Sequence, residues 1–162
     1  MAPARNDQDP RPCGLYRTIL SLPGHEDAVP AQRLVYFHNH SERGGPVVLL
    51  PESNTNNKWR FQGAGLPAND EAFIAAMEPL KPEGLYRVRE HFHPDGARVV
   101  PAGALAQLGY NRRADPILFF PQPVSGENAI AFPAKGMSIP PAVYALLDRI
   151  DLRGPHEPKR LH

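Results

Sequence analysis

The chain has 162 residues, of which 41% are hydrophobic and 22% are charged, and this composition is typical of a globular protein. Eighteen Lys and Arg against seventeen Asp and Glu leave a net charge of +1, which argues against the concentrated basic face that binding to a nucleic acid needs. The single cysteine cannot form an internal disulfide, and no apolar run approaches membrane-spanning length. We therefore expect a cytoplasmic protein with no membrane association and no nucleic-acid partner.

An internal repeat organises the sequence. The tetrapeptide Gly-Leu-Tyr-Arg occurs at residues 14–17 and again at residues 84–87, a spacing of 70 residues. Two further pairs of segments match at nearly the same spacing: residues 29–31 with 100–102, and residues 46–51 with 116–121. Self-similarity at one fixed period indicates that the chain contains two copies of one structural unit.

We predict a tandem duplication of a ~70-residue unit, because one unit of that size buries too little surface to be stable alone. The first unit spans residues 13–82 and the second spans 83–152, with disordered tails at 1–12 and 153–162. Each unit is predicted to have the element order β-β-β-β-α, in a mainly β (α+β) fold of small barrels or curled antiparallel sheets packed as a pseudo-twofold pair. One merged sandwich is the alternative.

Aromatic and β-branched runs predict the strands of the first unit. These strands lie near residues 15–20, 34–38, 47–50 and 59–61. Residues 52–58, which are polar, are predicted to form a loop between the last two strands. Trp59 is the only tryptophan and has Ile130 as its counterpart in the second unit, while Phe61 corresponds to Phe132. Both phenylalanines are therefore predicted core residues.

Each unit is then predicted to close with a helix. The first helix begins at a capping Asn69 or Asp70 and has one apolar face. That face comprises Phe73, Ile74, Met77 and Leu80. The second helix opens at the Pro140-Pro141 pair, where missing N–H groups cost little. Its apolar face comprises Val143, Leu146, Leu147 and Ile150.

Two His-x-His pairs are the best candidates for metal chemistry. His38 and His40 form one pair, and His91 and His93 form the other. On a strand, residues i and i+2 point to the same face, so each pair can present two imidazoles together. Zn, Ni or Fe needs three or four such ligands, and the two pairs supply them only if they meet across the packed units. The alternative is that the histidines simply occupy half-wet strand ends.

Tyrosine and arginine side chains are the candidate contacts for a partner, since both residue types often anchor interfaces. The candidates are Tyr16, Arg17, Trp59, Tyr86, Arg87, Arg112 and Arg113. The loops at 41–46, 52–58 and 122–128 are predicted to carry recognition as well. For the repeated Tyr-Arg pair the structural interpretation is favoured, because a duplication preserves scaffolding residues in both copies.

These observations favour a non-enzymatic binding or accessory protein that presents the loops of a duplicated β module to a protein partner. We expect no cofactor in that case. The alternative is a metal-binding protein or metal-dependent enzyme that uses the two His-x-His pairs and a divalent transition metal. Nucleic-acid binding through Arg112 and Arg113 ranks third. The sequence does not specify an oligomeric state.

Overall fold

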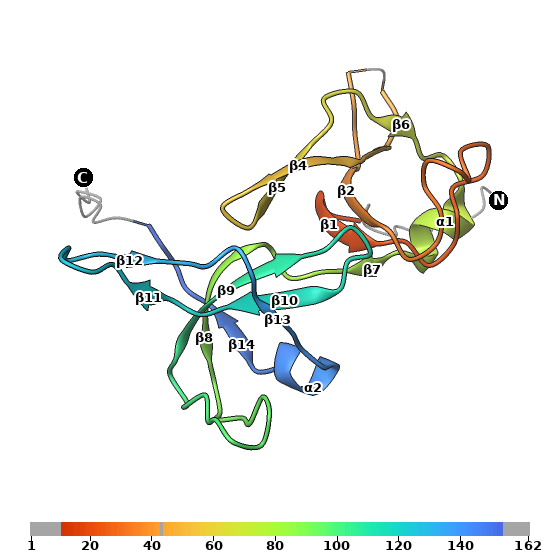
Figure 1. Ribbon diagram of the computed structural model, residues 1–162. Coiled ribbons are helices and arrows are strands. Elements are labelled where there is room, and N and C mark those ends of the chain that lie inside the picture. Colours follow the sequence, from red (N-terminus) through yellow and green to blue (C-terminus); the bar gives the residue numbers. More distant parts are fainter. Residues whose placement is uncertain (1–10, 43, 154–162) are drawn as a thin grey trace, which may run out of the picture.

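The computed structural model describes residues 11–42 and 44–153 (Figure 1). The predicted disordered tails therefore lie almost wholly outside the described residues. Within them the fold is mainly β, as predicted, with antiparallel sheets and two short helices. The two helices cover little of the chain because prolines and glycines interrupt it so often.

The first unit contains a five-stranded antiparallel sheet with the strand order β6-β3-β2-β1-β7. Its strands are β1 (Gly14–Arg17), β2 (Leu34–His38), β3 (Val47–Leu49), β6 (Leu66–Pro67) and β7 (Glu78–Pro79). A separate hairpin, β4 (Pro51–Thr55) with β5 (Lys58–Phe61), is inserted between β3 and β6. The predicted polar loop at 52–58 is thus most of this hairpin, and its turn has Asn56 and Asn57 at positive φ, which asparagine tolerates well.

The second unit contains a sheet with the corresponding order, β13-β10-β9-β8-β14. Its strands are β8 (Gly84–Val88), β9 (Leu105–Tyr110), β10 (Pro116–Phe119), β13 (Met137–Ser138) and β14 (Leu147–Arg149). A second hairpin, β11 (Gln122–Pro123) with β12 (Ile130–Ala131), is inserted between β10 and β13. The order of strands, hairpin and helix along the chain is the same in both units.

The repeated tyrosines show that the match extends to side-chain contacts. Tyr16 and Tyr86 are each 2% exposed. The Tyr16 hydroxyl donates to the carbonyl of Pro12 at 2.8 Å, and the Tyr86 hydroxyl donates to the carbonyl of Pro82 at 2.6 Å. Each tyrosine thus ties its strand to the residue four positions before it, and this buried contact explains why the residue recurs.

The predicted closing helices begin where expected, after the capping Asp70 and at the Pro140-Pro141 pair, but they are shorter than predicted and do not end their units. Helix α1 spans Glu71–Ala76, and helix α2 spans Pro141–Tyr144. Each is followed by an edge strand, β7 or β14, that pairs with the first strand of its own sheet. Met77 is already extended, with φ −59° and ψ 135°, so of the apolar residues predicted for the end of the first helix, Met77 precedes β7 and Leu80 follows it. Pairing with β7 and β14 satisfies backbone groups on the otherwise open edges of β1 and β8.

Of the two predicted forms, small barrels or curled antiparallel sheets, the barrels are wrong, because among the described residues neither five-stranded sheet closes on itself. Each unit has its own apolar core. The first is built around Val35, Phe37 and Phe73, and the second around Tyr86 and Leu108. The second core also takes in buried side chains from the first unit, Leu15 and Leu34.

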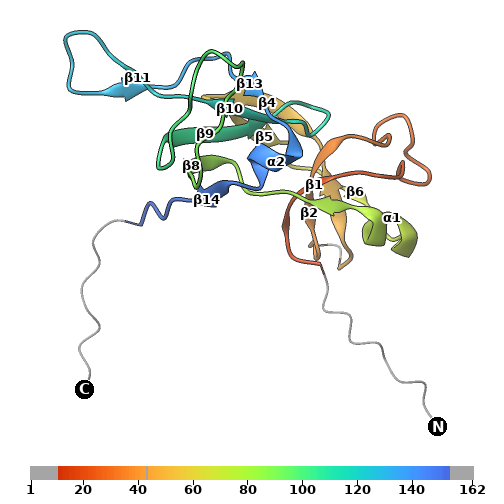
Figure 2. The same cartoon turned by 90° about the horizontal axis from the view of Figure 1, so that it is seen from below.

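The two units do not pack as a pseudo-twofold pair. Leu15 and Leu34 of the first unit join the core of the second, and the Leu34 N–H donates to the Arg112 carbonyl at 2.8 Å. Hairpin β4–β5 lies beside the second sheet, whereas its counterpart β11–β12 extends away from both sheets (Figures 1 and 2). Trp59 on the first hairpin donates its indole N–H to the Tyr110 carbonyl at 2.7 Å, while the corresponding Ile130 is 56% exposed. The contacts are not reciprocal, so the packing is heterologous.

The expected core positions on the two hairpins are also only partly realised. Phe61 and Phe132 are half-buried, and neither belongs to the buried residues of the two cores. Phe61 packs instead against Tyr36, with ring centroids 5.7 Å apart. The hairpins form separate two-stranded ribbons, so neither phenylalanine enters a sheet core, and Phe61 lies at the junction of the units instead.

Candidate functional site

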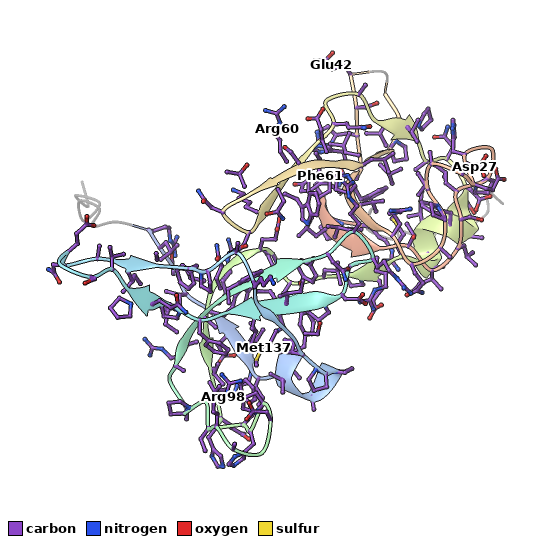
Figure 3. All side chains as sticks on the ribbon, viewed as in Figure 1. Asp27, Glu42, Arg60, Phe61, Arg98 and Met137 are labelled. Atoms are coloured by element: carbon purple, nitrogen blue, oxygen red, sulfur yellow. The ribbon has the colours of Figure 1, made fainter. Side chains whose placement is uncertain are left out.

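The two His-x-His pairs lie in different segments of the fold. His38 ends β2 and His40 follows it, with ring centroids 6.2 Å apart. His91 and His93 lie in the connection between β8 and β9, with ring centroids 6.0 Å apart. Figure 3 shows Glu42, which follows the first pair, and Arg98, which follows the second, at opposite ends of the molecule.

Each pair brings two imidazole rings close, as the i, i+2 spacing predicts, but the two pairs do not converge. In the part of the chain that the structure describes, no group of three or more His, Cys, Asp or Glu side chains is arranged to hold a metal ion. The ring of His38 packs on Tyr36 instead, at 4.9 Å between centroids. This arrangement agrees with the structural interpretation of the histidines.

The arginines of the repeated tetrapeptide have different roles in the two units. Arg17 donates to the Ala114 carbonyl at 2.6 Å and to the Glu78 carboxylate at 3.1 Å, so it joins the two units. Arg87 is exposed on β8. Of the repeated Tyr-Arg pairs, only Arg87 is therefore free to meet a partner over most of its surface, since Tyr16 and Tyr86 are buried.

The remaining candidates lie at the junction of the two units. The guanidinium of Arg112 lies over the indole ring of Trp59 at 4.9 Å and donates to the Pro51 carbonyl at 2.9 Å. This cation–π contact helps to hold hairpin β4–β5 against the second unit. The neighbouring Arg113 is exposed. Asn57 at the hairpin turn adds a side-chain hydrogen bond of 2.9 Å to Gln107 of β9.

A cleft of about 460 Å³ opens beside this hairpin, where the two units meet; we call it the junction cleft. Four aromatic side chains of the first unit line it: Tyr16, which is buried, and Tyr36, Trp59 and Phe61, which are half-buried. Pro79, Leu80 and Pro82, from the segment that connects the units, also line it. Its volume lies within the usual range for a ligand site, and its lining is mostly apolar with a few polar groups, as in most such sites.

Glu83 supplies the carboxylate of the junction cleft. It is half-buried, and its two carboxylate oxygens accept the backbone N–H of Trp59 at 3.3 and 3.2 Å. Burial raises the pKa of Glu83 to about 7, while the hydrogen bond from Trp59 and the positive charge of Lys58 act in the opposite direction. No cationic side chain in the described ranges lies within ion-pair distance of it. Lys58, Arg149 and Cys13 complete the polar lining.

A second cleft, of about 390 Å³, lies on another side of the connecting segment, and Leu80 lines both clefts. Its charged groups are already paired, since Arg17 binds Glu78 there. Its tyrosines form a network in which the Tyr110 hydroxyl lies 2.9 Å from that of Tyr144. Burial raises the pKa of Tyr110, so this hydroxyl stays protonated. The second cleft is therefore a structural contact between the units.

Sequence reasoning selected Trp59 but missed Glu83 and Tyr36. The signal for Glu83 was present, because it stands one position before the second Gly-Leu-Tyr-Arg, where the first copy has Cys13. A polar difference between copies at a matched position marks a residue that the shared scaffold does not require. Tyr36 has the polar Gln107 as its partner in the second copy and shows the same signal.

Comparisons with protein families, with curated proteins and with solved structures find no match for this chain. Neither helix found in residues 11–42 and 44–153 has the length and apolar character needed to cross a membrane.

Proposed function

We propose that the protein is a non-enzymatic binding protein, formed by tandem duplication of one β-rich unit, and that the junction cleft is where it holds a protein partner. Two observations support the duplication. The 70-residue sequence repeat coincides with two sheets of corresponding strand order, and the paired residues correspond as well: Tyr16 pairs with Val35 in the first sheet, and Tyr86 pairs with Ala106 in the second.

The observation that carries the binding function is the aromatic lining of the junction cleft. Tyr36 and Trp59 occur in the first copy only, with Gln107 and Ile130 at the matching positions of the second. Trp59 also holds hairpin β4–β5 in place through Tyr110 and Arg112, yet its ring and that of Tyr36 still line the open cleft. Aromatic side chains are enriched at binding hot spots, because they offer a large contact area at a low cost in conformational entropy.

The position of the cleft also favours a macromolecular partner. Hairpin β4–β5, which contains most of the predicted recognition loop at 52–58, forms one wall through Lys58, Trp59 and Phe61. A partner that contacts the exposed residues of β4 can thus reach the cleft at the same time. Hairpin β11–β12, which includes most of the loop at 122–128, extends into solvent and supplies a second contact region (Figure 2). The single cysteine fits a reducing, cytoplasmic compartment for this interaction.

Site-specific photo-crosslinking tests this function. A photoreactive amino acid replaces the exposed Lys58 at the rim of the junction cleft, and a matched variant carries it at the exposed Arg98, at the far end of the molecule (Figure 3). We expect a discrete crosslinked protein from position 58 in cells and none from position 98. Equal crosslinking from both positions, or none from position 58, would contradict the proposal.

A further inference from the structure

The half-buried carboxylate of Glu83 has no positively charged side chain within ion-pair distance among the described residues. It lines the junction cleft, it is half-buried, and its only hydrogen-bond donor among the described residues is the Trp59 N–H, shared between its two oxygens. An ionised carboxylate has about four acceptor positions, and a buried charge is normally paired. The free positions on Glu83 are therefore available to a donor that enters the cleft.

The other titratable and charged groups around Glu83 do not take that place. Lys58 and Arg149 line the same cleft, but both are exposed and neither forms an ion pair with it in the described part of the chain. Cys13, Tyr16 and Tyr36 are the remaining ionisable side chains of the lining, and none of them is cationic. Burial, with a smaller effect from the negative charge of Glu83, raises the pKa of Tyr110, so its hydroxyl stays protonated. Lys58 is close enough to lower the pKa of Glu83, so a cation that enters the cleft competes with an exposed side chain that forms no ion pair with the carboxylate.

The aromatic rings of the cleft suit the same kind of ligand. Tyr36 and Phe61 are tilted by 54° with centroids 5.7 Å apart, and Trp59 already carries a guanidinium, that of Arg112, over its ring. Aromatic faces attract cations, and more strongly where water is excluded. Leu80 and the prolines of the connecting segment would contact an alkyl stem. An ammonium group at the end of a flexible apolar stem satisfies both the carboxylate and this lining.

We propose that the junction cleft takes a lysine side chain of the protein partner, with its ammonium group paired to Glu83 and its alkyl stem among Tyr36, Trp59 and Phe61. This inference rests on the proposed function and specifies which residue of the partner enters the cleft. Arginine is the less suitable choice, because its wide planar guanidinium carries five N–H donors, whereas Glu83 alone supplies carboxylate acceptors in the cleft.

Trp59 makes the proposal directly measurable, because it is the only tryptophan of the chain and it lines the cleft. Nα-acetyl-lysine amide is titrated into the full-length protein at pH 8 while tryptophan emission is recorded. Nα-acetyl-norleucine amide has a similar stem without the charge, and Nα-acetyl-glutamate amide has the opposite charge. A short alanine-based peptide with one central lysine tests whether a polypeptide can deliver the same group.

We expect the lysine compound to bind in the millimolar range and the norleucine compound to bind about tenfold more weakly, since one ion pair is lost. Glu83→Gln, which keeps the shape and an acceptor for the Trp59 N–H, should reduce lysine affinity about tenfold as well. Glu90→Gln, on an exposed loop residue, is the matched control and should have no effect. Equal binding of lysine and norleucine, no binding of lysine, an unaffected Glu83→Gln variant or tighter binding of the glutamate compound would each overturn the inference.

The two proposals can fail separately. If position 58 crosslinks a protein but Glu83→Gln changes neither probe binding nor crosslinking, the lysine inference is wrong and the binding function stands. If the free lysine compound binds through Glu83 but the lysine peptide does not bind and position 58 crosslinks no protein, the cleft serves a small amine. In that outcome both the protein partner and its lysine are refuted.

Discussion

Replacing Glu83 by glutamine should remove most of a pH dependence that this one residue gives to the stability of the protein. The pKa of Glu83 rises from an ordinary 4.5 to about 7 in the folded state, because burial disfavours the charged form. Between these two pH values the folded state holds a proton that the unfolded state has released. The free energy of unfolding therefore falls as the pH rises from 4.5 to 7 and is flat above that window.

The size of this effect follows from the shift. One pKa unit corresponds to about 1.4 kcal/mol, so the full shift sets an upper limit of about 3 kcal/mol. Glu83 is only half-buried, and solvent screening reduces the contribution to about 1–2 kcal/mol. Glutamine keeps the acceptor for the Trp59 N–H and carries no charge. The variant should therefore match the wild type at pH 4.5 and be more stable by about 1–2 kcal/mol at pH 8.

Urea denaturation at a series of pH values measures this difference. The useful quantity is the free energy of unfolding of the variant minus that of the wild type, since titrations elsewhere cancel in the difference. Glu90→Gln, which changes an exposed carboxylate, should give a difference that stays near zero across the same range. A flat difference for Glu83→Gln, or one that favours the wild type at pH 8, would refute the reasoning.

Three further substitutions, and Gly63→Ala as a control, test the junction by urea denaturation. Gly109→Ala should destabilise the protein by about 1–3 kcal/mol, because the new Cβ would lie 3.0 Å from a backbone carbonyl at the tip of hairpin β4–β5. Gly63→Ala meets open space and should change the stability by less than about 0.5 kcal/mol; equal effects would contradict the docked hairpin. Trp59→Phe removes the indole donor to the Tyr110 carbonyl and should cost about 1–2 kcal/mol, and no loss would exclude that hydrogen bond as a stabilising contact. Tyr110→Phe leaves the Lys81 carbonyl without its hydroxyl donor and should cost about 1–3 kcal/mol. A loss no larger than that of a neutral surface substitution would contradict this role of the hydroxyl.

The candidate site was only partly predictable from the sequence. Trp59 stood out as a residue without an equal in the second copy, and it does line the junction cleft. Glu83 gave a weaker signal, because a glutamate beside a repeated motif is unremarkable until its burial is known. The His-x-His pairs gave the strongest signal in the sequence, yet His40 and His91 lie in separate connections that the fold does not bring together.

The sequence by itself determined the local features of this protein: the 70-residue repeat, the apolar runs of the central strands, and the capping Asp70, whose carboxylate accepts the Phe73 N–H at 2.7 Å. The apolar runs and the helix cap depend on residues a few positions away, so they can be recognised in the sequence. The repeat is recognised from the constant spacing of its matching segments. Whether a short apolar segment ends as helix or as edge strand depends on an open sheet edge, and this is why the predicted closing helices were too long.

Only the tertiary structure decided how the two units meet. The contact is heterologous, with hairpin β4–β5 against the second sheet and β11–β12 left free, and Gly109 permits this close approach where the first unit has His38 (Figure 1). That asymmetry creates the junction cleft and buries Glu83 beside Trp59. Two nearly equivalent units can dock in many ways, and the choice rests on a few side chains far apart in the chain, which no repeat or periodicity records.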